Sequence, residues 1–279
     1  MNTSKILYDS ATITKEVFSA PAFEVKNEAA EFPCLLVCEH ASNYIPPTYM
    51  NLGLSTTDIE THIGWDIGAR ALLDHLSTNL KCSTVSCNYS RLLIDCNRPL
   101  DAASLIPDVS EHYTVPGNSD ISHQEHQLRI NSIYKPFHAA VESQVLRLKD
   151  LHPQLPVIGI HSFTPVFHGE KRPWEFSLMW KQKSPFIRAL IEYFQNHEIK
   201  DVVGYNEPYS VEAIRAYTTE HYTDVHKLPA AIFEVRQDLL GDQEGIERWS
   251  SIIQTALRYA LRSVGVGSTQ FNQAQEHVD

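Results

Sequence analysis

The sequence is poor in basic residues and has no long apolar run. Lys and Arg together number 23 against 34 Asp and Glu, which gives a formal charge of -11 at pH 7. No stretch is dense in Lys or Arg, so we do not expect nucleic acid as a partner. No apolar run reaches the roughly 20 residues of a membrane helix, and the first residues lack the apolar core of a signal peptide. We therefore expect no membrane partner and a cytoplasmic location, while the oligomeric state stays open.

Paired cysteines are also missing. The chain has five cysteines, none in a CxxC step, and most lie in apolar segments, namely Cys34, Cys38, Cys82, Cys87 and Cys96. An odd number without paired spacing argues against a disulfide framework and against a zinc-thiolate cluster. We expect buried, reduced thiols.

The sequence contains no internal repeat, no low-complexity tract and no linker rich in Gly and Ser. Apolar residues make up 43% of the chain and aromatic residues 10%, which is enough for a packed core. We expect a single domain over residues 1–279, in which segments 1–30 and 269–279 are peripheral or frayed.

Apolar segments with strand character alternate with amphipathic segments. The predicted strands are Cys34–Cys38, Ser83–Cys87, Leu92–Asp95, Val157–Ile160, Phe176–Trp180, Val202–Tyr205 and Ala230–Val235. The predicted helices are Thr56–Leu80, Ser122–Leu148 with a break near Pro136, Pro185–Asn196 and Glu244–Arg262. This alternation predicts an α/β fold whose mixed, mainly parallel sheet is covered on both faces. In such sheets, ligands bind at the carboxyl ends of the central strands.

Two predicted strands end in a histidine. Leu155–Ile160 leads into His161, and Phe32–Cys38 leads into Glu39 and His40. Strand ends hold side chains rigidly, and neutral imidazole binds zinc well. Taken alone, each histidine fits a hydrogen-bonded core or loop residue, but the two together indicate a metal site.

Catalytic zinc usually has three protein ligands, so an acidic residue is needed beside the two histidines. Asp66 is our first choice, because it interrupts an apolar segment beside Gly64 and Gly68, where a buried carboxylate needs a partner. In the predicted helix it shares a face with His62, four residues earlier. Glu39 is the alternative, although neighbouring side chains in an extended segment point to opposite sides.

Arginines and a further carboxylate follow other predicted strands. Arg91 and Arg98 flank Asp95 and Asn97, so an arginine there could bind an acidic substrate or simply pair with Asp95. Glu234 and Arg236 lie two residues apart on an apolar strand and should share a face. Glu234 is our candidate for the base that takes a proton from water, although these two residues could also pair with each other.

Six blocks of the chain, taken together, resemble the N-formylglutamate amidohydrolase family. They are Cys38–Ser42, His62–Ala69, Ser90–Arg98, His161–Pro165, Asn206–Tyr209 and Glu234–Leu239, and the likeness covers about 33–240. The family is related to zinc carboxypeptidases and cell-wall amidases, so the resemblance implies a phosphorylase/hydrolase-like three-layer α/β/α sandwich. The pattern of metal ligands and catalytic glutamate in the cell-wall amidases resembles the set His40, Asp66, His161 and Glu234 of this chain. The carboxypeptidase spacing is not met, since Asn43 stands where a carboxylate is expected, and Glu39 stays an alternative ligand.

The resemblance and the residues lead to one functional expectation. A zinc ion held by His40, Asp66 and His161 would serve hydrolysis of a linear amide on a small acidic molecule, plausibly N-formyl-L-glutamate to formate and glutamate. Glu234 is the expected catalytic residue, and Arg91, Arg236, Asn97 and Ser162 are the expected substrate-binding residues. The alternatives are a zinc amidase or peptidase for another acyl amino acid or peptide, and a non-catalytic protein that binds an acidic metabolite.

Overall fold

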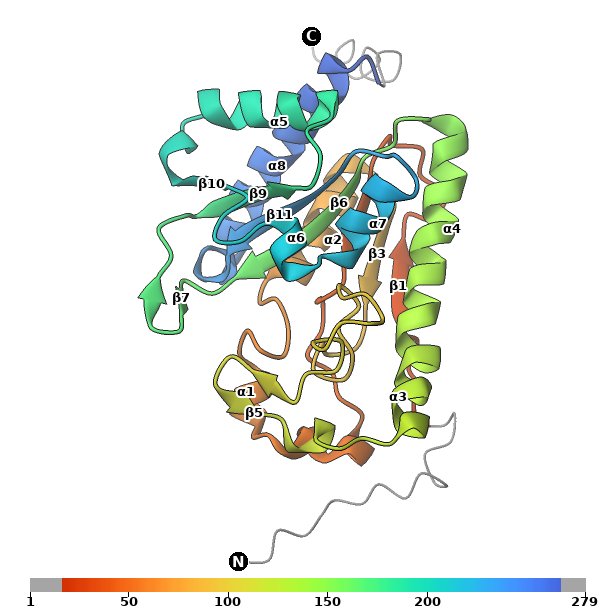
Figure 1. Cartoon of the computed structure of the whole chain (residues 1–279). Helices are drawn as coiled ribbons and strands as arrows, with labels where there is room; N and C mark the ends of the chain where they lie inside the picture. The colour runs from red at the N-terminus through yellow and green to blue at the C-terminus, as the bar shows by residue number, and fades with distance from the viewer. Residues whose placement is uncertain (1–16, 267–279) are drawn as a thin grey trace, which may run out of the picture.

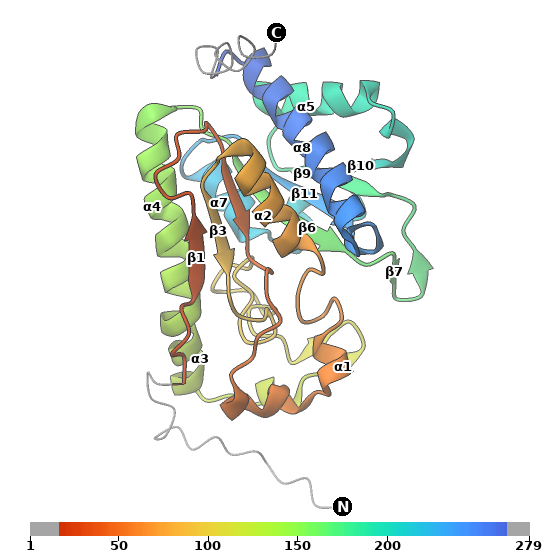
Figure 2. The same cartoon turned by 180° about the vertical axis from the view of Figure 1, so that it is seen from behind.

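The computed structural model describes residues 17–266 and contains a seven-stranded sheet between two layers of helices (Figures 1 and 2). The strand order is β1-β3-β2-β6-β11-β9-β10. Four strand pairs are parallel, whereas β1 with β3 and β9 with β11 are antiparallel. The predicted mixed, mainly parallel three-layer α/β/α sandwich is confirmed.

The strands of the sheet are three to seven residues long, within the usual range for globular proteins. Their bounds are β1 Phe23–Lys26, β2 Leu35–Cys38, β3 Thr84–Cys87, β6 Val157–Phe163, β9 Phe176–Trp180, β10 Val203–Tyr205 and β11 Ala230–Arg236. Two small hairpins lie outside the sheet and are formed by β4 Val109–Ser110 with β5 Tyr113–Thr114, and by β7 Val166–Phe167 with β8 Glu170–Lys171.

The helices divide between the two faces of the sheet. They are α1 Thr56–Ile59, α2 Ala69–Leu80, α3 His123–Arg129, α4 Lys135–Leu151, α5 Pro185–Asn196, α6 Val211–Ile214, α7 Tyr217–Asp224 and α8 Gln243–Ser263. Helices α2, α5 and α8 cover one face, and α4 and α7 lie on the other (Figures 1 and 2). A π-helical turn, Ile130–Tyr134, joins α3 to α4, so the predicted break near Pro136 is a change of helix type just before it.

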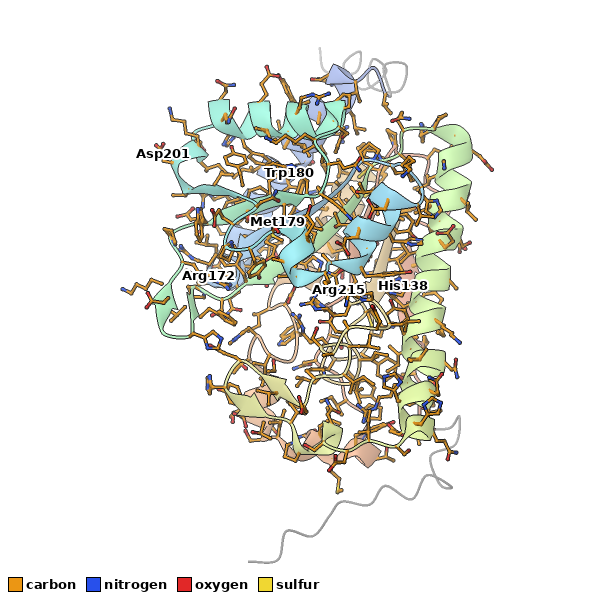
Figure 3. All side chains as sticks on the ribbon, in the orientation of Figure 1. His138, Arg172, Met179, Trp180, Asp201 and Arg215 are labelled. Atoms are coloured by element: carbon orange, nitrogen blue, oxygen red, sulfur yellow. The ribbon has the colours of Figure 1, made fainter. Side chains whose placement is uncertain are left out.

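Strand β2 illustrates why the core has two halves. Leu36 and Cys38 pack with α2 and α8, whereas Leu35 and Val37 pack with α4. Successive side chains of a strand point to opposite faces, and here both faces are buried. A continuous apolar run is therefore the correct signature for this strand, and side chains fill both interfaces between the sheet and its helices (Figure 3).

The predicted helix Thr56–Leu80 is wrong in its middle. The chain forms α1, leaves the helix at residues 60–68, and enters α2 at Ala69. Gly68 precedes α2 with a φ of 81°, which a right-handed helix cannot accommodate. The interruption allows the amide of Asp66 to donate a hydrogen bond to the carbonyl of His40, at 2.9 Å. Asp66 therefore lies in a connection and not on a helix face with His62.

The predicted strand Leu92–Asp95 is also wrong. Leu92, Leu93 and Ile94 are buried, but Leu92 and Leu93 lie in a turn and Ile94 has no regular secondary structure. Polar side chains accept hydrogen bonds from the backbone here. Ser90 Oγ accepts one from the amide of Leu92, and Asp95 Oδ1 accepts one from the amide of Asn97. Such local bonds compete with strand pairing.

The ends of the chain differ from the expectation in one respect. Residues 23–26, within the segment expected to be peripheral, form the edge strand β1. The predicted frayed tail 269–279 lies outside the described residues.

All five cysteines are buried and free, as predicted. No helix within residues 17–266 is long and apolar enough to cross a membrane.

Candidate metal and active site

A pocket of about 350 Å³ opens beside the carboxyl ends of β2, β6 and β11. The long connections that follow β2 and β3 gather at this end of the sheet (Figure 1). The pocket is lined by His40, His62, Ile63, Asp66, Arg91, Asn97, Arg98, Ser110, Glu111, His161, Ser162, Phe163, Thr164, Phe167, Arg172, Tyr209, Ile214 and Glu234. This is the position predicted for a ligand site.

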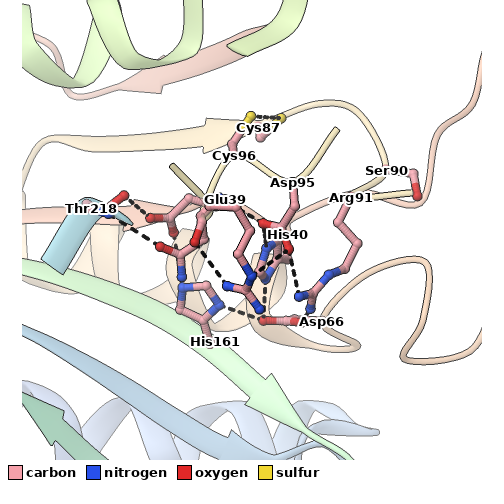
Figure 4. A network of polar contacts seen from close by, with 12 residues as sticks. Glu39, His40, Asp66, Cys87, Ser90, Arg91, Asp95, Cys96, His161 and Thr218 are labelled. Carbon is pink, nitrogen blue, oxygen red and sulfur yellow. Dashed lines mark hydrogen bonds and ion pairs between the residues drawn. The ribbon is translucent and has the colours of Figure 1, made fainter. Parts of the chain in front are cut away.

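His40, Asp66 and His161 meet at the floor of the pocket and are all buried (Figure 4). Oδ2 of Asp66 lies 2.7 Å from Nδ1 of His161 and 3.4 Å from Nδ1 of His40. One ligand atom from each residue lies within 4.8 Å of the others. The three side chains therefore present two imidazole nitrogens and a carboxylate oxygen to one small volume.

A second carboxylate lies behind each of these imidazoles (Figure 4). Nε2 of His40 lies 2.7 Å from Oδ1 of Asp95, and Nε2 of His161 lies 3.0 Å from Oε2 of Glu39. Glu39 also accepts a hydrogen bond from the hydroxyl of Thr218 on α7. In each histidine, Nε2 contacts this second carboxylate. Nδ1 is therefore the nitrogen that faces Asp66 in both rings.

Strand register explains how residues distant in sequence reach this arrangement. Val37 of β2 pairs with Gly159 of β6, and two residues further along each chain are Glu39 and His161. On the other side of β6, Glu234 of β11 pairs directly with His161. The three central strands therefore bring these side chains to one end of the sheet.

The electrostatics of the site favour ionised carboxylates close to the histidines. Burial opposes ionisation of Asp66, but His40 and His161 hold the pKa of its carboxyl well below its usual range. Burial also opposes ionisation of Glu39, yet its hydrogen bond with His161 lowers the pKa. The site thus concentrates negative charge around nitrogens that can bind a cation.

Glu234 differs from the other carboxylates of the site. Burial raises the pKa of this residue above its usual value. Its side chain is 7% exposed and lines the pocket. No hydrogen bond or ion pair of its carboxylate is found within residues 17–266, so the group is available to a substrate or to water.

Three arginines line the pocket, and they differ in how far their charge is compensated. Arg91 lies 3.4 Å from Asp66 and 2.9 Å from Asp95, and Arg98 lies 4.0 Å from Asp95. The guanidinium of Arg172 has no hydrogen bond or ion pair within the described part of the chain. It lies over the rings of Phe163, Phe167 and Tyr209, at 5.7, 4.7 and 5.6 Å. The sequence analysis does not predict Arg172 as a site residue, because the short β7–β8 hairpin before it has no recognisable sequence pattern.

The other predicted substrate-binding residues have different positions. Asn97 and Ser162 line the pocket, and Ser162 Oγ donates to the carbonyl of Ile67 at 2.7 Å. Arg236 is not among the lining residues, and its Nε lies 2.7 Å from Oδ1 of Asp238. The expectation that Glu234 and Arg236 act side by side therefore lacks support from the geometry, and Arg236 pairs with Asp238 rather than with Glu234.

The donor set fits a divalent metal ion such as zinc. Two imidazoles and one carboxylate are ligands that zinc commonly takes, with the remaining position open for water or substrate. Nδ1 of His40 is buried and makes no hydrogen bond with any residue of the described range 17–266, which is costly for a polar atom unless another partner is bound. The carboxylates behind both rings are the usual partners of metal-binding histidines.

Comparison with known families decides the assignment. The family model described as N-formylglutamate amidohydrolase matches residues 32–240, which includes every residue of the site discussed above. The chain belongs to the N-formylglutamate amidohydrolase family. Its membership makes it an amidohydrolase, and the resemblance predicted from the six sequence blocks is confirmed.

Two solved structures are similar to this chain in fold. A gene product of Agrobacterium tumefaciens is similar, with a TM-score of 0.81, 33% identity, and coverage of 88% of this chain and 97% of that one. An N-formylglutamate amidohydrolase from Ralstonia eutropha shares the fold, with a TM-score of 0.57, 16% identity, and coverage of 88% and 98%. A comparison with curated proteins gave no match.

Proposed function

We propose that this chain hydrolyses the amide of a small acidic N-acyl amino acid, with N-formyl-L-glutamate as the preferred substrate and formate and glutamate as products. The observation that carries the proposal is the convergence of His40, Asp66 and His161 beside the unpaired carboxylate of Glu234. Family membership supports the same reaction. The predicted cytoplasmic location and single-domain organisation stay predictions.

In this proposal His40, Asp66 and His161 hold one divalent ion, preferably zinc. When bound, zinc supplies Lewis-acid polarisation of the amide carbonyl and lowers the pKa of a water molecule. Asp95 and Glu39 act behind the two rings, where their hydrogen bonds fix the orientation of each imidazole. Glu39 is thus proposed as a positioning residue and Asp66 as the ligand, because Glu39 faces the opposite nitrogen of His161.

Glu234 is the proposed proton carrier. A base must remove a proton from the attacking water, and an acid must protonate the leaving nitrogen of the amide. A carboxylate whose pKa is raised by burial can perform both steps, since it gains and releases a proton closer to neutral pH. Its register beside His161 places it next to the proposed metal ligands.

Arg172 is the proposed anchor for a carboxylate of the substrate. Its guanidinium has no hydrogen bond or ion pair within residues 17–266 and lines a pocket with aromatic walls, so it is well suited to bind a carboxylate bidentately. Arg91 is already paired with Asp66 and Asp95. We therefore propose that its main contribution to substrate binding is the positive electrostatic potential that it adds to the pocket. Asn97 and Ser162 complete the polar wall of a pocket whose volume suits a small molecule.

The direct test is release of formate from N-formyl-L-glutamate by the zinc-loaded chain. We expect turnover that a chelator abolishes and added zinc restores. Glu234→Gln should lower kcat by about 100-fold to 10,000-fold, the usual contribution of a general acid-base group, while zinc content is unchanged. Glu247→Gln, on the exposed face of α8, is the matched control and should retain full activity. A fully loaded enzyme inactive on every N-acyl amino acid would refute the proposal.

A further inference from the structure

A second group of metal-binding side chains lies between α4 and α7, and the function proposed above does not use it. Glu142 of α4, His221 of α7 and His226, just beyond α7, each offer a ligand atom within 4.8 Å of the others. Both views show α7 and α4 on the same face of the sheet (Figures 1 and 2). We propose that Glu142, His221 and His226 form a second binding site for a divalent transition-metal ion, which clamps α7 to α4.

Hydrogen bonds and ion pairs among the described residues involve Glu142 and His226 of this group but not the ring of His221. Nε2 of His226 lies 3.3 Å from Oε2 of Glu142, so these two residues form an ordinary ion pair when His226 is charged. The ring nitrogens of His221 make no hydrogen bond within residues 17–266, although its ring centre is only 5.2 Å from that of His226. A shared metal ion gives all three residues a partner.

The chemistry of the group favours zinc or a similar ion. Two imidazoles with one carboxylate form a donor set typical of zinc and related metals, whereas calcium and magnesium prefer oxygen ligands. Burial lowers the pKa of His221, and the neighbouring His226 lowers it further. Glu142 acts in the opposite direction, but the two larger effects favour the neutral ring that a metal ligand requires. The three residues are half-buried, which leaves a path for an ion to enter.

Surrounding aromatic residues hold the ligands in place. The hydroxyl of Tyr222 lies 3.2 Å from Oε2 of Glu142, and the ring of Tyr217 stacks on His221 at 5.2 Å. The ring centre of His138, one turn before Glu142 on α4, lies 4.7 Å from that of Tyr217. These contacts restrict the rotamers of the ligands, so less conformational entropy is lost when an ion binds.

The position of this group gives it a structural consequence. Helix α7 also carries Thr218, whose hydroxyl donates to Glu39, and its first amide donates to the carbonyl of Asn97 at 3.2 Å. An ion bridging Glu142 to His221 and His226 would tie the far end of this short helix to α4. The expected effect is slower opening of 217–226, measurable as hydrogen exchange without any assay of activity.

The decisive experiment counts bound zinc and cobalt by equilibrium dialysis of the full chain. Wild type should bind one more ion per chain than His221→Gln/His226→Gln, and Glu142→Gln should weaken the same ion. The double variant His123→Gln/His197→Gln, which removes two histidines outside both groups, should bind as wild type does. Asp66→Asn should lose only the ion of the pocket, so failure of the proposed function and failure of this second site are distinguishable.

Hydrogen exchange provides the second readout. Addition of zinc should slow exchange in residues 217–226 of the wild type and leave the His221→Gln/His226→Gln variant unchanged in that segment. Equal ion counts for the wild type and this variant, or equal slowing of exchange in both, would overturn the proposal.

Discussion

Nε2 of His40 lies 2.7 Å from Oδ1 of Asp95, and Nδ1 of the same ring lies buried 3.4 Å from Oδ2 of Asp66. Within the part of the chain that the structure describes, this Nδ1 makes no hydrogen bond. A carboxylate on one side of an imidazole fixes both the ring orientation and the nitrogen that carries the proton. His161 repeats the arrangement with Glu39 behind it. The two imidazoles are thus turned the same way before any ion binds.

Asp95→Asn tests the role of this contact. The amide keeps the shape of the side chain but loses the charge that orients His40, so we expect zinc affinity to fall by about 10-fold to 100-fold. Competition with a chelator of known affinity measures the change. Asp74→Asn, which alters an ion pair with Lys26 and Arg70 away from the pocket, is the control and should leave the affinity unchanged. Equal affinities of Asp95→Asn and wild type would contradict a positioning role.

Gly159→Ala tests the space that His161 needs. An added Cβ at this residue would lie 3.2 Å from Cδ2 and Nε2 of the imidazole, closer than most real contacts, so the ring must shift by a few tenths of an ångström. We expect weaker zinc binding and a lower kcat, because small displacements of catalytic groups are costly. Gly241→Ala, where the nearest atom is 3.9 Å away, is the matched control. If both variants behave as wild type does, the His161 ring is not held in the way described.

Arg172→Gln tests the proposed carboxylate anchor. A charged hydrogen bond contributes about 1.5–3 kcal/mol, so kcat/KM for N-formyl-L-glutamate should fall by about 10-fold to 100-fold. The loss should be much smaller for a formylated amino acid with an apolar side chain if Arg172 binds the side-chain carboxylate.

Arg236→Gln is the control for that experiment. Its guanidinium is paired with Asp238 and lies outside the pocket lining, so activity should be nearly unchanged. The opposite ranking of the two arginine variants would restore the sequence-based prediction that Arg236 binds substrate.

His138 should make the stability of the fold depend on pH. Burial lowers the pKa of this histidine from 6.5 to about 4, while Nε2 donates to the carbonyl of Cys96 at 2.9 Å. Its contribution is complete above pH 6.5, where the ring is neutral in both states. It is lost as the pH falls from 6.5 toward 4, because the unfolded chain then binds a proton that the folded chain does not. The loss amounts to at most about 3 kcal/mol.

The measurement for His138 is the melting temperature between pH 7 and pH 4.5. His138→Gln retains an amide that can donate to Cys96 but removes the titration, so its stability should fall less steeply with acid than that of the wild type. His152→Gln is the control. It removes a histidine that also donates to a backbone carbonyl, but in an exposed hydrogen bond. Parallel curves for wild type and His138→Gln would show that the burial of His138 does not have the predicted effect.

The sequence predicts most of the sheet, because buried strands appear as largely apolar runs, such as the one ending at Cys38. It also predicts His40, His161 and Glu234 near one another, since parallel strands deliver the residues at their ends to the same edge. The unusual polarity of Asp66 within an apolar segment predicts it as a ligand, and the structure brings it to both histidines. The helix assumed for it was wrong, because Gly64 and Gly68 mark a connection rather than a tolerated interruption.

Other parts of the site leave no local signal. Arg172 reaches the pocket through the β7–β8 hairpin, and Thr218 reaches Glu39 through the placement of α7. Both depend on long-range packing that no spacing in the chain encodes. The sequence identifies Asp95 and Glu39, the second partners of the histidines, as residues near the site. Their roles cannot be read from it, because they depend on which ring nitrogen faces which carboxylate.

The most direct test of the central claim is an anomalous difference map from crystals of the zinc-loaded protein. The account predicts a peak bound by Nδ1 of His40, a carboxylate oxygen of Asp66 and Nδ1 of His161, with Glu39 and Asp95 still bonded to the opposite ring nitrogens. A map with no peak among these three residues, or a peak that Glu39 binds in place of Asp66, would contradict it.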